Sequence, residues 1–160
     1  MEVEMKINRL ILDHMTNMPV VELKDEGSET VLPIWVGVPE ANAIALEIEK
    51  VATPRPMTHD LLKNLLVGLD AVVRKVVVTE LREDIFFAVI WLERDGQMIS
   101  IDSRPSDALA LALRVDCPIF VEEEVLKSSR ALSEADPVSS EEMRKWLENL
   151  GEDETGRYKM

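Results

Sequence analysis

The chain contains a single cysteine, Cys117, among its 160 residues. One cysteine excludes an intramolecular disulfide and any zinc site built from several cysteines. No run of about 18 uncharged apolar residues occurs, which argues against a membrane-spanning helix. Residues 1–8 alternate acidic and apolar side chains and lack the basic-then-apolar order of a signal peptide. We therefore expect a cytoplasmic protein with no membrane contact.

Basic side chains are also scarce. Lys and Arg number 18 against 31 Asp and Glu, which gives a formal net charge of −13. Because proteins that bind nucleic-acid phosphates normally concentrate Lys and Arg, this charge argues against a broad basic groove. The hydrophobic share of 46% and the charged share of 31% are ordinary for a globular protein, and the length suits one domain.

The spacing of apolar residues predicts strands and helices in an order that occurs twice. The first series has strands over 6–13, 19–23 and 30–36, then helices over 40–51 and 59–69. The second has strands over 72–80, 85–92 and 98–102, a helix over 105–114 and a short buried strand over 118–121. Strand and helix alike are therefore expected throughout the first 121 residues.

Residue matches between the two series favour an internal duplication. Ala41–Leu46 aligns with Ser106–Leu111 at an offset of 65, which sets the polar residue Asn42 opposite Asp107. The alternative is a chance likeness of two amphipathic helices. Two copies are too few for a solenoid, and each alone would leave one sheet face bare. We predict a single α+β domain over 1–127, made of a duplicated β-β-β-α unit with largely antiparallel sheets and helices packed on them.

Residues 128–160 differ in character from the predicted domain. They begin with a polar linker that contains Pro137, and Ser140 then suits the cap of an amphipathic helix. The apolar stripe of that helix would be Met143, Trp146, Leu147 and Leu150. We expect the helix to dock on the domain, with presentation of the stripe to a partner as the alternative, and a frayed tail over 151–160.

Two polar clusters interrupt the pattern, each at the predicted start of a helix. The first holds Arg55, Thr58, His59 and Asp60, and the second holds Asp102, Arg104, Ser106 and Asp107. Backbone N–H groups at a helix start favour an anion, and arginine can hold a phosphate or carboxylate with two parallel hydrogen bonds. The histidine can move a proton near neutral pH. If the fold joins the clusters, they form an anion site with an acid–base pair.

A purely structural role for both clusters is the alternative. Thr58 and Ser103 suit helix caps, and the arginines could simply pair with nearby acids that stabilise the helix dipoles. The sequence gives only weak support for a metal site. A hard cation such as Mg²⁺ or Mn²⁺ would need several oxygen ligands, which Glu40, Asp60, Asp102 and Asp107 could supply. No spacing matches a zinc or calcium signature, so the sequence leaves the metal unknown and makes no cofactor evident.

Motifs at these clusters resemble a known family. The quoted segments are Leu32-Pro33-Ile34-Trp35-Val36-Gly37, Glu40-Ala41, Pro54-Arg55-Pro56-Met57-Thr58-His59-Asp60-Leu61-Leu62 and Ile101-Asp102-Ser103-Arg104-Pro105-Ser106-Asp107-Ala108. Over roughly residues 5–127 they closely resemble the bifunctional nuclease domain family. The resemblance implies an α+β fold with an internal duplication, activity on DNA and RNA, and self-association, most simply as a dimer. Some bacterial relatives continue into a UvrB/UvrC-type helical motif, for which the end of this chain is too short.

Carried over to this chain, the family motifs imply a site made of both clusters. As a hypothesis from their chemistry, His59 would act as general base or acid in phosphodiester cleavage, and Asp60 is a further catalytic candidate, although adjacent side chains on a helix diverge and the two need not cooperate. Arg55 and Arg104 would stabilise the developing charge, and Asp102 with Asp107 would orient the histidine or hold a divalent ion. Thr58, Ser106 and, at the periphery, Glu40 would contact substrate.

Three functions remain open from the sequence. The first is a nuclease that hydrolyses phosphodiester bonds in DNA and RNA. The second is a non-enzymatic or regulatory module whose pocket takes a phosphorylated or carboxylated ligand, and the third is a dimeric scaffold for protein interactions. The net charge favours the last two, whereas the resemblance favours the nuclease. Charge averaged over the chain still allows a compact phosphate site.

Overall fold

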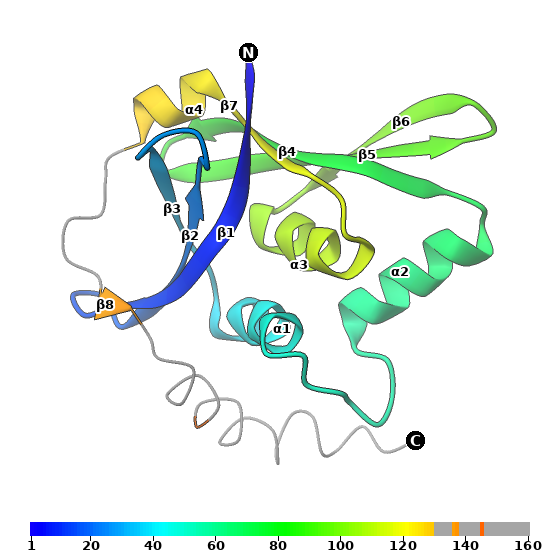
Figure 1. Ribbon diagram of the computed structural model, residues 1–160, viewed down its shortest axis with the longest axis horizontal. Helices are drawn as coiled ribbons and strands as arrows, with labels where there is room; N and C mark the ends of the chain where they lie inside the picture. Colours follow the sequence, from blue (N-terminus) through cyan, green and yellow to red (C-terminus); the bar gives the residue numbers. More distant parts are fainter. Residues whose placement is uncertain (130–135, 138–144, 146–160) are drawn as a thin grey trace.

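The computed structural model describes residues 1–129, 136–137 and 145, and a single bent sheet runs through them (Figure 1). The strands are β1 (Glu2–Asp13), β2 (Met18–Lys24), β3 (Val31–Trp35), β4 (Val72–Arg82), β5 (Ile85–Arg94), β6 (Gln97–Ser103), β7 (Ile119–Glu122) and β8 (Asp136–Pro137). The helices are α1 (Val38–Ile48), α2 (Thr58–Gly68), α3 (Pro105–Val115) and α4 (Glu123–Ser128). The main strand order is β3-β2-β1-β7-β4-β5-β6, and β8 pairs with β1.

Two antiparallel three-stranded units meet at β7. One is β1-β2-β3 and the other is β4-β5-β6. Between them β7 runs antiparallel to the start of β1 and parallel to β4. Because β1 pairs with β7 over residues 2–5 and with β2 over residues 6–13, it joins both units into one mixed sheet.

The central strands are apolar on both faces, as expected for strands that are covered on each side. In β4 the consecutive residues Val76, Val77 and Val78 are all buried, and in β2 so are Val20 and Val21. β-Branched side chains suit this pleated, densely packed setting. The middle of the sheet is therefore the rigid base on which the helices are placed.

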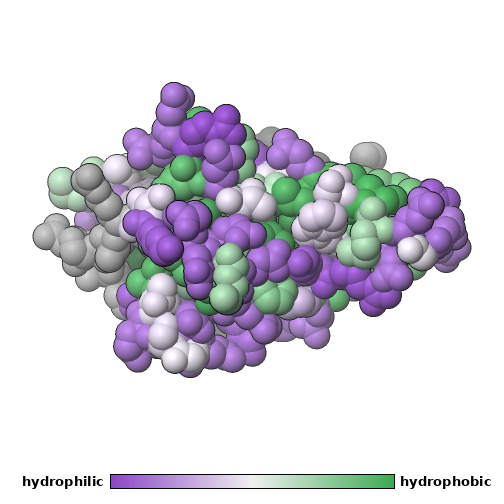
Figure 2. All heavy atoms as spheres, turned by 90° about the horizontal axis from the view of Figure 1, so that it is seen from above, coloured by the Kyte–Doolittle hydropathy of each residue, from purple (hydrophilic) through white to green (hydrophobic). Residues whose placement is uncertain are grey.

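Three helices lie together on the concave side of the sheet (Figure 1). The first, α1, packs on α3, and α3 packs in turn on α2 and against β4 and β5. Eight residues of α3 are buried, whereas within α2 only His59 is buried. On the face seen in Figure 2, apolar side chains gather on the half of the molecule that holds α2 and β4–β6. That half consequently keeps much of its apolar surface uncovered.

The predicted α+β class is confirmed, and each helix and strand expected between residues 6 and 121 is present near its expected position. The strands are largely antiparallel, as expected, and they form one sheet in which β7 pairs with β4 in parallel. The strand order suits two related β-β-β-α units, but the duplication itself stays a prediction. Of the helix expected from Ser140, only Lys145 is among the described residues, and it is helical. The proposed boundary at 127 stays a prediction. Among the described residues no helix is long and apolar enough to cross a membrane.

Candidate active site

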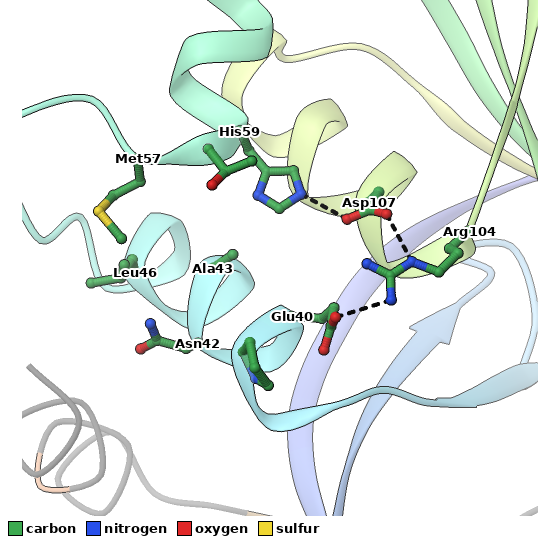
Figure 3. A pocket seen from close by; sticks show the side chains of 10 residues that line it. Glu40, Asn42, Ala43, Leu46, Met57, His59, Arg104 and Asp107 are labelled. Carbon is green, nitrogen blue, oxygen red and sulfur yellow. Dashed lines mark hydrogen bonds and ion pairs between the residues drawn. The ribbon is translucent and has the colours of Figure 1, made fainter. Parts of the chain in front are cut away.

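The first turns of three helices converge on one pocket, and they bring both sequence clusters with them (Figure 3). Thr58 and His59 come from the start of α2, Arg104 immediately precedes α3, and Asp107 lies in the first turn of α3. The first turn of α1 adds Glu40. Proline at the start of α1 and of α3 pre-organises the backbone for a helix there, which fixes where these side chains emerge.

A continuous chain of hydrogen bonds links four of these side chains (Figure 3). The distance from His59 Nε2 to Asp107 Oδ1 is 2.9 Å. The other carboxylate oxygen of Asp107 accepts a bond of 2.9 Å from Arg104 Nε. Arg104 Nη1 donates to Glu40 Oε1 at 3.0 Å. The guanidinium therefore bridges α1 and α3, and the same carboxylate of Asp107 extends the link to α2.

This arrangement keeps Asp107 ionised and sets the histidine tautomer. Burial acts to raise the pKa of Asp107, but hydrogen bonds from Arg104 and His59 outweigh it and hold the pKa below the ordinary value of 3.8. An ionised carboxylate can only accept, so we assign the proton to His59 Nε2. In the neutral imidazole the other ring nitrogen, Nδ1, carries a lone pair, and Figure 3 shows it on the side of the ring away from Asp107. This lone pair is suited to accept a proton.

The pocket has a volume of about 280 Å³ and two unlike ends. Its polar end is the hydrogen-bonded chain, in which the Arg104 side chain is 65% exposed and so open to an incoming group. The opposite end is formed by Ala43, Leu46 and Met57. A ligand with a charged group and an apolar or aromatic part matches this division.

Asn42 lines the same pocket and carries an unpaired polar atom. The residue is only 4% exposed, and within the part of the chain that the structure describes its side-chain Oδ1 has no hydrogen-bond partner. A buried amide oxygen left unpaired costs about 1–3 kcal/mol, so a ligand that donates a hydrogen bond here would recover part of that cost. Asn42 is the residue that the repeat aligns with Asp107, and both line one pocket.

Asp60 faces away from this chemistry and holds α2 in place. Its Oδ1 accepts a bond of 2.8 Å from Arg114 Nε, and its Oδ2 accepts one of 2.9 Å from the backbone N–H of Met57. Arg114 is 4% exposed at its side chain and also donates to the carbonyls of Ala110 and Ala43. One buried arginine thus ties α1, α2 and α3 together beneath the pocket.

The remaining predicted residues lie outside the pocket. Arg55 is exposed in the loop before α2, where its carbonyl accepts a bond from Thr53 Oγ1. Asp102 is exposed on β6 and borders a neighbouring cavity of about 410 Å³, which Asp107 also touches. Ser106 is buried and lines a third cavity, beside Trp35. The structure therefore joins the two clusters through His59, Thr58, Arg104 and Asp107, with Glu40.

Two local expectations about helix starts need correction. The residue that precedes α2 is Met57, so Thr58 is the first helical residue and not its cap. The residue that precedes α3 is Arg104 and not Ser103. In α2 the capping acceptor is the Asp60 carboxylate, three residues into the chain from Met57. This frees the Thr58 side chain to line the pocket.

Sequence reasoning missed Arg114 and gave Asn42 no functional role. Arg114 stands alone among apolar residues over 108–115, which was the one available signal that it is buried and paired. No group of three or more His, Cys, Asp or Glu side chains that could hold a metal occurs among the described residues. Asp107 Oδ2 and Glu40 Oε1 each accept a hydrogen bond from Arg104. The donor set therefore does not form a ready metal site.

Known proteins resemble this chain over most of its length. An uncharacterized protein of Mycobacterium tuberculosis is 37% identical over 158 residues, which cover 98% of this chain and 90% of that protein. The protein called bifunctional nuclease 1 in rice (Oryza sativa subsp. japonica) is 27% identical over 81% of this chain and 40% of its own length. The one so named in Arabidopsis thaliana is 31% identical over 64% of this chain and 33% of its own length.

A protein-family model also matches this chain. The model for the bifunctional nuclease domain matches residues 21–134, a stretch that contains all five residues gathered at the pocket. The stretch also spans β3 through α4 and hence all three helices that build the pocket. The chain belongs to the bifunctional nuclease domain family.

Proposed function

We propose that the protein hydrolyses phosphodiester bonds of DNA and RNA in the pocket between α1, α2 and α3. The observation that carries the proposal is the hydrogen-bonded chain from His59 through Asp107 to Arg104, which sets a proton acceptor and a cation at one pocket. Membership of the bifunctional nuclease domain family supports it, as do the names of the plant relatives. The chemistry is that of general base catalysis beside a charged donor.

In the proposed reaction, His59 Nδ1 takes a proton from water as its oxygen attacks phosphorus. Asp107 stabilises the imidazolium that forms, since its carboxylate holds the Nε2 proton. Arg104 donates to the phosphate oxygens as negative charge builds on them, and the imidazolium then returns the proton to the leaving oxygen. Glu40 keeps the guanidinium aimed at this point.

A divalent ion has no step in this proposal. Mg²⁺ or Mn²⁺ would have to displace Arg104 from both Glu40 and Asp107, because both carboxylates are bonded to it. The described residues offer no third ligand beside them. Activity that survives EDTA is therefore the expected result, and strict dependence on either ion would assign the carboxylates a different role.

The proposed substrate is a short single strand. The net charge of −13 disfavours a wide grip on a duplex, and a pocket of about 280 Å³ holds about one nucleotide. With the phosphate at Arg104, a base would lie against Ala43, Leu46 and Met57 and donate a hydrogen bond to Asn42 Oδ1. None of these contacts needs a 2′-hydroxyl, which suits both DNA and RNA.

The test is cleavage of short single-stranded DNA and RNA by purified protein, with EDTA and with added Mg²⁺ or Mn²⁺. We expect His59→Ala and Asp107→Asn each to lose at least about 10²-fold in rate. Asp102→Asn is the matched control, because Asp102 lies outside the pocket and the same change there should leave the rate within about twofold. No activity in the wild type, or equal activity in all four proteins, would contradict the proposal.

A phosphate-ligand module is the second candidate, and the acidic lining favours it. Two carboxylates already neutralise Arg104, so a small ligand that is held and not cleaved would also fit. Calorimetry with a nucleoside monophosphate separates the two functions: binding that Asn42→Ala and Arg104→Ala weaken, without any cleavage of longer strands, identifies the module. The proposed setting is the cytoplasm, where a lone thiol stays reduced.

The proposed working unit is a dimer. If this dimer acted only as a scaffold for other proteins, the pocket would need to perform no reaction. Two features support self-association: the exposed Leu61, Leu62 and Leu65 of α2, and the outer edge of β6, which pairs with no other described strand. A dimer is compatible with either the nuclease or the ligand module, because neither surface contains His59 or Arg104.

A further inference from the structure

The sheet ends on two very different edge strands. At one end, β3 carries Pro33 in its centre, and its three middle residues are buried. At the other end, β6 has seven residues, no proline, no lysine or arginine, and pairs with β5 through its whole length without a bulge. Natural proteins normally protect an open edge with proline, lysine, a bulge or a covering segment. Among the described residues nothing pairs with the outer edge of β6.

Apolar side chains surround this unprotected edge. Met98, Ile99 and Ile101 of β6 are 50%, 39% and 42% exposed. Ile99 and Ile101 share a face with Leu92 and Ile90 of β5, since they are direct partners in the ladder. On the same side, leucines of α2 border a cavity of about 410 Å³ together with Ile101. The edge and the helix therefore form one apolar groove.

The leucines of α2 make this groove large enough for a stable contact. Leu61, Leu62 and Leu65 of α2 and Leu69, just after its end, are between 38% and 53% exposed, although their spacing is that of a core-facing stripe. With Ile99 and Ile101, the two apolar residues of β6 on the α2 side of the sheet, they expose on the order of 500 Å² of apolar surface, against about 800 Å² in all that one partner contributes to a standard interface. The surface is thus of the size that a dimer buries.

The geometry points to a second copy of this chain as the occupant, with β6 paired to β6 of the partner in antiparallel fashion about a two-fold axis at Ser100. In that register all seven residues pair: Ile99 lies opposite the partner's Ile101, and Met98 opposite the partner's Asp102. Asp102, the only charged residue of the strand, therefore does not lie opposite the partner's Asp102. The two-fold axis is perpendicular to the sheet, so both α2 helices lie on the same side and cover the paired isoleucines.

This pairing specifies the dimer of the proposed function, but it is independent of the proposed chemistry. Sedimentation measures mass and not cleavage, so a failed nuclease assay leaves the pairing intact. Likewise, a monomer would leave the pocket and its hydrogen bonds unchanged, because His59, Arg104 and Asp107 are held within one copy.

The test is sedimentation velocity of the full chain at about 50 μM, with two lysine variants. The wild type should be a dimer, and Ser100→Lys should be a monomer, because it sets two like charges directly opposite at the axis. Met15→Lys makes the same addition of charge at an exposed turn between β1 and β2 and should stay dimeric. A monomeric wild type, or a Ser100→Lys protein that is folded by circular dichroism and still dimeric, overturns the pairing.

Disulfide crosslinking tests the register. In a Cys117→Ser background, Ser100→Cys should form an intermolecular disulfide on mild oxidation, because each new cysteine faces its own copy. Met98→Cys should crosslink at least tenfold more slowly, since it lies opposite the partner's Asp102. Equal rates for the two, or faster crosslinking at position 98, overturn the register.

Discussion

Helices α2 and α3 have the same length and a similar supply of leucine, yet the fold uses them in opposite ways. Eight of the eleven residues of α3 are buried, against His59 alone in α2. The difference follows from position: α3 packs on α1, β4 and β5, whereas the main contact of α2 is α3. An apolar stripe therefore does not by itself tell how much of a helix its own chain covers, because that depends on where the helix lies in the fold.

The start of α2 is held by polar bonds in place of apolar packing. Asp107 on α3 holds His59, and Arg114 on the same helix holds Asp60. These two bonds place the proposed base against the proposed phosphate site. In this region apolar packing holds α3 in place, and hydrogen bonds from Asp107 and Arg114 of α3 hold the start of α2. Leu61, Leu62 and Leu65 of α2 stay exposed.

Truncating one leucine on each helix gives the largest contrast. Leu109→Ala should lower the free energy of unfolding by about 4 kcal/mol, because Leu109 is fully buried and the change leaves a cavity. Leu65→Ala should cost less than about 1 kcal/mol, since Leu65 is half exposed. Urea titrations in the monomeric Ser100→Lys background give both values. Equal losses would show that α2 is packed as tightly as α3.

Removing the carboxylate that ties α2 to α3 should have the next largest effect. Asp60→Ala leaves the buried guanidinium of Arg114 without its counter-charge and should cost about 3 kcal/mol in stability. Asp60→Asn keeps an oxygen for the Met57 N–H and should cost less. The expected signature is lost stability with an unchanged pH profile of cleavage. A changed pH profile at full stability would make Asp60 part of the chemistry.

Acid should weaken the link between α2 and α3 in a defined range. Although burial raises it, the pKa of Asp107 lies below 3.8 because Arg104 and His59 bond to the carboxylate. A carboxyl with a lowered folded pKa stabilises the fold above its ordinary pKa and loses that effect as pH falls through the lower value. The stability advantage of wild type over Asp107→Asn that comes from this carboxylate should therefore shrink as pH falls below about 4. An advantage that keeps growing as pH falls below about 4 would contradict this assignment.

The smallest expected effect concerns the thiol just beyond α3. Burial raises the pKa of Cys117 to about 11, so the thiolate is scarce at neutral pH. Alkylation by iodoacetamide should be slow at pH 8 in the folded protein and should rise at least tenfold when urea unfolds it. Fast alkylation of the folded chain would show that the end of α3 opens readily.

The sequence predicted the fold class and the order of elements because both depend on local spacing and turn residues. It also indicated that the segments around His59 and Arg104 each begin a helix. It could not show which carboxylate would meet His59, since Asp60, Asp102 and Asp107 carry the same group. That choice depends on how α2 crosses α3, where Asp60 turns to Arg114 and Asp107 turns to His59. The parallel pairing of β7 with β4 is likewise a long-range contact without a local signal.

The central claim is that one pocket, and not the whole polar segment before α2, carries out the cleavage. The most direct measurement compares His59→Ala with Arg55→Ala, two residues of the same motif, in cleavage of a short single strand. Because His59 lies in the pocket and Arg55 is exposed outside it, we predict a loss of at least about 10²-fold for the first and less than threefold for the second. Equal losses, or a greater loss for Arg55→Ala, would contradict the claim.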